Sequence, residues 1–219
     1  MDITGLLEYA GPVIYASLAI AALYGLFCVV LLVLRVQQKK FASEAAAQDF
    51  LGGVRGRMDE GDFEGAAEFC DTPEHWAKAL PQLVLVALAE RDRPLPALRR
   101  HLEEKFERDV IADLEYRQSW VGTIVKSAPM LGLLGTVSGM IGAFAKIATT
   151  SESGTDPAAL ANDISFALFT TAMGLAVAIP LTILGAWARV RIGRLADGVE
   201  QHLGEFLDDF EAARKANPA

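Results

Sequence analysis

The chain has 219 residues, of which 52% are apolar and 22% are charged, and its formal net charge is −8 at pH 7. A net negative charge argues against nucleic acid as a partner. The apolar residues gather in three runs that contain no charged residue and no histidine, at residues 11–34, 127–145 and 164–188. This uneven distribution argues against a single water-soluble domain.

The first predicted element is a membrane-spanning helix over residues 11–36. Its uncharged run is 24 residues long, and at about 1.5 Å of rise per residue it is long enough for a hydrocarbon core of about 30 Å. A cleaved secretory signal is the other interpretation of this run. However, residues 1–10 contain Asp2 and Glu8 without any lysine or arginine, and the run is too long for a signal. We therefore expect a retained span.

Residues 37–119 are polar, and their turn signals predict several short helices. These signals are Gly52-Gly53, Gly61-Asp62, Thr72-Pro73 and the stretch from Pro94 to Pro96. From Ala97 onward, apolar residues recur every four positions, which predicts an amphipathic helix that continues into the second span. The repeating positions are Leu98, Leu102, Phe106, Val110 and Leu114.

The second and third spans are predicted at residues 120–147 and 163–188, around uncharged runs of 19 and 25 residues. A second amphipathic pattern follows the third span and predicts that its helix continues to the end of the chain. This pattern consists of Ile192, Leu195, Val199, Leu203, Phe206 and Phe210.

Basic residues at the span ends predict the orientation in the membrane. They follow the first and third spans, as Arg35, Lys39, Lys40, Arg189, Arg191 and Arg194, whereas the opposite ends are acidic, with Asp2, Glu8, Glu152, Asp156 and Asp163 against the single Lys146. The sequence thus predicts an all-α membrane protein with three transmembrane helices, its N-terminus outside and its C-terminus inside. The predicted parts are a periplasmic N-terminus (1–10), span 1 (11–36), a cytoplasmic helical region (37–119), span 2 (120–147), a periplasmic loop (148–162), span 3 (163–188) and a cytoplasmic helix (189–219).

The uncharged runs contain hydroxyl and small residues but no Asp, Glu, Lys, Arg or His that would mark an ion path of the chain's own. Thr136 and Thr171 each lie near the middle of a span and close to glycine, where a hydroxyl could face a lumen. Stripes of small residues, which include Gly132, Gly135, Gly139 and Gly174, are more often helix packing faces. Pro129 and Pro180 free backbone carbonyls that are tolerated where they line a cavity.

We expect no enzyme active site, cofactor or metal site. The sequence lacks a metal-ligand cluster, a nucleophile with its base and a phosphate-binding loop. We expect the scattered His75, His101 and His202 to be surface residues. Cys28 and Cys70 are expected to be buried free thiols.

Two motifs make the chain resemble the MotA/TolQ/ExbB proton-channel family, in its three-span ExbB/TolQ branch. They are the sequence APMLGLLGTV at residues 128–137, followed by GMI at 139–141, and the sequence TAMGL at 171–175, followed by AIP at 178–180. The stretch GDFEGAA at residues 61–67 also matches.

This resemblance implies a ring of five subunits in the bacterial inner membrane around single-span partners of the ExbD/TolR type. The partner's intramembrane aspartate would carry the proton, and Thr136 and Thr171 would face the lumen. Such a motor subunit uses proton-motive force to power envelope or biopolymer transport. Relatives often carry glutamate five residues before the second threonine, where this chain has Phe166, so the lumen mouth is expected to be more apolar. A non-conducting oligomeric membrane scaffold, held together by its glycine stripes, remains the alternative.

Overall fold

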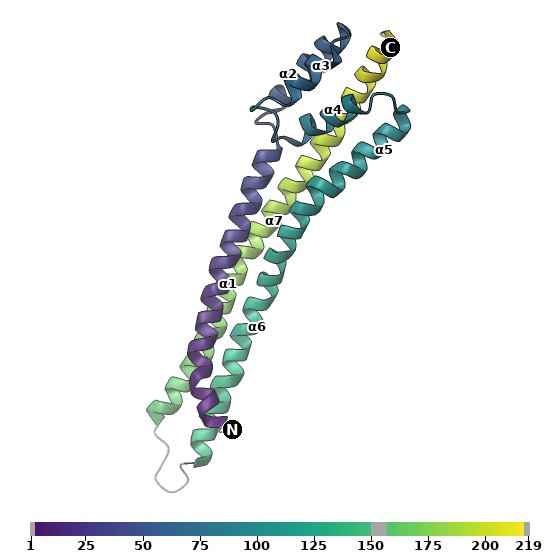
Figure 1. The fold of residues 1–219 in the computed structure, drawn as a ribbon. Helices are drawn as coiled ribbons and strands as arrows, with labels where there is room; N and C mark the ends of the chain where they lie inside the picture. The colour runs from purple at the N-terminus through teal and green to yellow at the C-terminus, as the bar shows by residue number, and fades with distance from the viewer. Residues whose placement is uncertain (1–2, 150–156, 217–219) are drawn as a thin grey trace. The chain divides into compact units, whose positions relative to one another are not determined.

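The computed structural model describes the backbone of residues 3–149 and 157–216, and the side chains from residue 11 to 148 and from 157 to 216; every regular element within these limits is helical (Figure 1). The predicted acidic residues Asp2, Glu152 and Asp156 and the side chain of Glu8 lie outside them. The elements are α1 (Ile3–Lys39), α2 (Glu44–Asp59), α3 (Phe63–Cys70), α4 (Ala79–Ala89), α5 (Leu95–Phe106), the π-helical η1 (Glu107–Ile111), α6 (Ala112–Thr149) and α7 (Pro157–Ala216).

Three helical stretches of the described chain are long and apolar enough to cross a membrane, namely Gly11–Lys39, Leu95–Ala148 and Pro157–Ala216. This confirms the prediction of an all-helical chain with three helices that could cross a membrane. Their most apolar windows are only 17–28% buried within the chain. Most of their apolar surface is therefore available to lipid or to other subunits.

The observed helices are longer than the predicted spans. Leu95–Ala148 is one helical stretch that passes through α5, η1 and α6, and α7 starts at Pro157, six residues before the expected start of span 3. Proline favours the first turn of a helix, because its fixed φ suits that position and its missing N–H would have no helical partner there. The limits of the membrane-embedded parts themselves stay predictions.

The chain divides into two compact units, which we describe separately. Unit 1 comprises Met1–Val30 and Gln118–Trp187. Its core joins α1, α6 and α7 through Ile14, Leu18, Ala128 and Ala178. Small side chains at two of these four positions bring the helix backbones close together, which is how helices associate in lipid.

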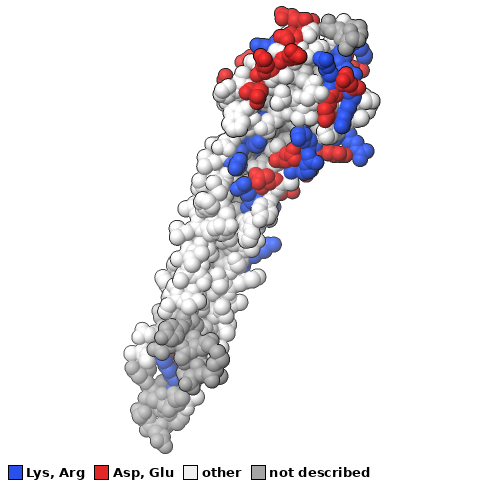
Figure 2. All heavy atoms as spheres, in the orientation of Figure 1, with Lys and Arg blue, Asp and Glu red and all other residues white. Residues whose placement is uncertain are grey.

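Unit 2 comprises Leu31–Arg117 and Ala188–Ala219. Charged side chains gather over this unit on the face in view, whereas few appear on unit 1 (Figure 2). A large apolar core holds its helices together, as expected where burial of apolar surface from water drives folding. α7 contributes to this core at spacings of three and four, with Ile192, Leu195, Val199, Leu203, Phe206 and Phe210.

Two of the three histidines are buried, so the expectation of surface histidines is wrong for them. His75 is 9% exposed and lies among the rings of Phe41, Phe50 and Phe69. His202 is 5% exposed and hydrogen-bonds Glu44. The apolar pattern gave no sign of this, because it does not show that the His75 ring packs among three phenylalanine rings or that Glu44, far away in the sequence, lies beside His202.

Cys70 should be unreactive in the folded protein. Burial raises the pKa of its thiol to about 12, and the thiolate is the form that reacts with maleimides. In a Cys28→Ser chain in detergent at pH 8, we expect N-ethylmaleimide to modify Cys70 roughly a thousandfold more slowly than an exposed thiol, in proportion to its smaller thiolate fraction. Mass spectrometry over time measures the two rates.

The matched control for Cys70 is Gly52→Cys in a chain that lacks both native cysteines. Gly52 is exposed on α2, and a Cβ atom there meets no atom within 4 Å. Labelling of Cys70 as fast as this control would show that Cys70 is accessible to solvent and would contradict its burial in the core of unit 2.

Candidate functional site

The two threonines predicted for the site meet between α6 and α7 in unit 1. The hydroxyls of Thr136 and Thr171 are in direct hydrogen-bond contact. Thr136 Oγ1 also lies 3.2 Å from the Gly132 carbonyl oxygen and 3.3 Å from that of Ala167, and Thr171 Oγ1 lies 3.1 Å from Gly132 O. Both side chains are half-buried. One side of the pair is therefore accessible from outside the chain.

A third hydroxyl, which the sequence reasoning missed, completes this group. Thr170 is fully buried, and its Oγ1 lies 2.8 Å from Ala167 O and 3.3 Å from Gly132 O. We call Thr136, Thr170 and Thr171 the threonine cluster. Thr170 precedes Thr171 in the sequence but lies off the stripe of small residues, so helical spacing did not select it.

The threonine cluster has more acceptors within reach than each hydroxyl hydrogen can use. Each hydroxyl has one hydrogen and two acceptor lone pairs, and each of the three contacts at least two acceptor oxygens. Rotation about the C–O bond can therefore redirect a hydrogen without moving heavy atoms. The cluster is a neutral group that can donate to or accept from a polar partner on its half-exposed side.

The predicted glycines allow α6 and α7 to approach this closely. A Cβ atom would lie 2.8 Å from Thr170 O if added at Gly132, 2.3 Å from Thr170 Oγ1 at Gly135 and 2.8 Å from Ala167 Cβ at Gly139. On α7, a Cβ atom at Gly174 would lie 2.7 Å from Ala128 O. These glycines are therefore used for contact between α6 and α7 of the same chain.

Both predicted prolines lie inside their helices. Pro129 is half-buried on α6, and Pro180 is exposed on α7. Because proline has no N–H, the carbonyls of Val125 and Ala176 lack the usual hydrogen bond from four residues later. Neither proline belongs to the threonine cluster.

Phe166 packs against α1. Its ring makes an edge-on contact with Tyr15 at a centroid distance of 5.3 Å, and a Cβ atom at Gly11 would lie 3.1 Å from Phe166 Cζ. Tyr15 also lies beside Phe169, at 6.1 Å. Aromatic contacts with α1 thus occupy the position where relatives are expected to carry glutamate. Its effect on a lumen stays a prediction.

The chemistry available at this site is polar but not acidic or basic. Its hydroxyls can solvate a charged or hydrated group, yet they cannot hold a proton as a carboxylate does. Over the described side chains, no three His, Cys, Asp or Glu residues are grouped so as to hold a metal ion. Unit 1 also contains an ion pair outside the threonine cluster, in which Lys146 Nζ lies 2.7 Å from Asp163 Oδ2.

The chain is similar in sequence to a known family of membrane proteins. Residues 75–201 match the family described as the MotA/TolQ/ExbB proton channel family, a range that contains the whole threonine cluster. A protein of Methanothermobacter thermautotrophicus, named as a biopolymer transport protein ExbB homolog, is 30% identical over 194 residues, which cover 87% of this chain and 64% of that protein.

Two bacterial relatives match shorter parts. The Tol-Pal system protein TolQ of Haemophilus influenzae is 36% identical over 100 residues, covering 46% of this chain and 41% of TolQ. The biopolymer transport protein exbB1 of Vibrio cholerae is 42% identical over 72 residues, covering 31% of each chain. The chain thus aligns with less than two thirds of the length of each of these three relatives.

Contact between α6 and α7 should be sensitive to a single methyl group. We expect Gly174→Ala to destabilise the protein by about 1–3 kcal/mol, because the added carbon overlaps the backbone of α6. Gly142→Ala is the control, since a Cβ atom there meets nothing within 4 Å. Thermal unfolding in detergent measures both, and equal stability of the two variants would contradict the packing described here.

Proposed function

This chain belongs to the MotA/TolQ/ExbB proton channel family, and on that premise we propose that it is the channel-forming motor subunit of an ExbB/TolQ-type complex in the bacterial inner membrane. The complex uses proton-motive force to power envelope or biopolymer transport. Members of this family are transport-associated membrane proteins and not enzymes, so the chain is a membrane transport protein without an active site for catalysis.

One observation carries the proposal: three hydroxyls meet in the middle of two spans whose uncharged runs contain no titratable group. A proton cannot cross lipid without groups that replace water. The threonine cluster supplies such groups but no proton carrier. The carrier therefore comes from a single-span partner of the ExbD/TolR type, whose intramembrane aspartate faces Thr136 and Thr171.

Energetics support this division of roles. Burial of a carboxyl group in the membrane without hydrogen-bond partners is costly in either protonation state, and more so when it is charged. Hydroxyls that can turn to donate or accept lower this cost for both states. A partner aspartate can then alternate between protonated and ionised forms beside the cluster, which conduction requires.

The exposed apolar faces of unit 1 support a homo-oligomer, proposed as a ring of five. Large side chains of α6 and α7 remain exposed in the single chain, among them Met130, Leu133, Leu134, Leu168, Phe169 and Ile183. Some face lipid and others face neighbouring subunits. The basic residues after the first and third spans support an outside N-terminus and a cytoplasmic C-terminus.

The alternative of a non-conducting scaffold assumed association through the glycine stripes. In the folded chain, Gly132, Gly135 and Gly139 are covered by α7. These three glycines are therefore not available as an oligomer interface, which argues against a scaffold held together by them.

Proton flux tests the proposal directly. The chain reconstituted alone in vesicles should conduct little, and co-reconstitution with a single-span partner of the ExbD/TolR type should produce flux. In this complex, Thr136→Ala with Thr171→Ala should lower flux about tenfold or more, since loss of about 1–2 kcal/mol of hydrogen bonding corresponds to about a factor of ten. A pH-sensitive dye inside the vesicles reports the rate.

Thr182→Ala is the matched control for the double variant. Thr182 lies on α7 and donates to the Ala178 carbonyl at 2.7 Å, outside the threonine cluster, so its flux should stay near that of the unchanged complex. Full flux from the double variant would reject the site. Full flux from the chain alone would reject the borrowed proton carrier.

A further inference from the structure

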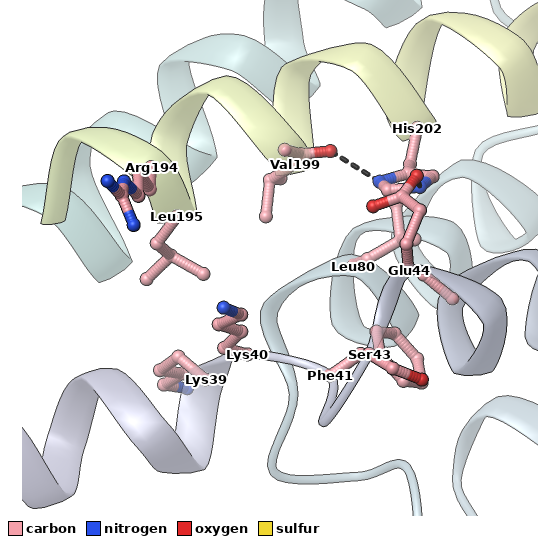
Figure 3. Close-up of a pocket in the computed structure, with 12 residues that line it drawn as sticks. Lys39, Lys40, Phe41, Ser43, Glu44, Leu80, Arg194, Leu195, Val199 and His202 are labelled. Carbon is pink, nitrogen blue, oxygen red and sulfur yellow. Dashed lines mark hydrogen bonds and ion pairs between the residues drawn. The ribbon is translucent and has the colours of Figure 1, made fainter. Parts of the chain in front are cut away.

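Unit 2 contains a half-open cavity of about 300 Å³ between the end of α1, the start of α2 and α7 (Figure 3). This volume is at the lower end of the range for small-molecule sites. Its polar lining consists of Lys39, Lys40, Ser43, Glu44, Arg194 and His202, and the remainder is mostly apolar. We propose that this cavity binds a phosphate group, carried either by an anionic phospholipid headgroup at the membrane boundary or by a soluble phosphate.

The cavity holds more positive charge than its own residues neutralise. Lys40 and Arg194 form no ion pair with any residue that the structure describes, although both line the same cavity. The Lys40 ammonium group points toward the space in front of α7 (Figure 3). Lys39 Nζ donates one hydrogen bond to Gln82 Oε1 at 3.1 Å, and two of its hydrogens remain.

The one carboxylate of the cavity already has a partner. Glu44 Oε1 lies 2.8 Å from His202 Nε2, and the other ring nitrogen of His202 contacts the Gly198 carbonyl oxygen. Both ring nitrogens thus face acceptor oxygens. The Glu44 carboxylate is therefore already engaged by the His202 ring. The lining thus holds three cationic side chains, Lys39, Lys40 and Arg194, against the single carboxylate of Glu44, and this excess of positive charge is available to an external anion.

The start of α2 adds a further electropositive element. Ser43 is the N-cap of this 16-residue helix, and its Oγ accepts a hydrogen bond from the backbone N–H of Ala46. The hydroxyl hydrogen of Ser43 is still able to donate. A helix N-terminus carries a partial positive charge that favours phosphate, here beside three cationic side chains.

The place of the cavity along the chain favours a lipid headgroup. Lys39 ends α1, three residues beyond the predicted end of span 1, a distance of about 4–5 Å along the helix. Lipid phosphates lie just outside the hydrocarbon core. The apolar part of the lining, which includes Leu195 and Val199, suits the glycerol and first methylene groups of a lipid. Basic pockets at the membrane boundary recognise anionic headgroups by this combination.

Binding can be measured on the full chain in detergent by native mass spectrometry. The probes are short-chain phosphatidylglycerol, short-chain phosphatidylcholine and inorganic phosphate. We expect phosphatidylglycerol to bind more tightly than phosphatidylcholine. Lys40→Gln and Arg194→Gln should each weaken binding about fivefold, in line with the attraction of one basic side chain to an anionic lipid. Lys40→Arg and Arg194→Lys, which keep the charge, should bind as the unchanged chain does.

Arg99→Gln is the matched control, because Arg99 is exposed on α5 of the same unit and does not line this cavity. Phosphatidylglycerol binding that inorganic phosphate does not displace would identify the lipid as the source. Displacement at equal phosphate concentration would identify a soluble phosphate site. The proposal is overturned if no probe binds, or if Lys40→Gln and Arg194→Gln bind as Arg99→Gln does. None of these outcomes depends on proton flux, so they leave the motor proposal to its own test.

Discussion

Close contact between the backbones of α6 and α7 is the constraint on which unit 1 depends. In lipid, helices gain little by hiding apolar side chains from one another, so their association requires short distances between backbones. Gly132, Gly135 and Gly139 provide these distances on α6, and Gly174 provides them on α7. Larger side chains there would separate the helices, and the three threonine hydroxyls would no longer share the carbonyl oxygens of Gly132 on α6 and Ala167 on α7.

Burial of apolar surface from water, and not close backbone contact, holds unit 2 together. Its core is built from large apolar side chains such as Phe50, Phe206 and Phe210, as in a water-soluble helical domain. The helices α1 and α7 each contribute one part to unit 1 and another part to unit 2. The same helix therefore carries a small-residue pattern suited to lipid and then a large-residue pattern suited to water.

The candidate site and the basic cavity use charge in opposite ways. The threonine cluster is neutral and offers hydrogen bonds where a fixed charge would be costly. The cavity in unit 2 gathers Lys39, Lys40 and Arg194, which form no ion pair within the described chain, and it does so next to a helix N-terminus. A neutral site accommodates a group whose charge changes, whereas a cationic site holds a permanent anion.

The sequence by itself determined the three spans, the absence of Asp, Glu, Lys, Arg and His from their uncharged runs and the family, because length, hydropathy and motif are local properties. It also selected Thr136 and Thr171 from their places in mid-span. It could not find Thr170, the burial of His202 or the cavity beside Lys40. Those depend on which helix faces meet, and this is decided by packing between segments far apart in the chain, which spacing along one helix does not specify.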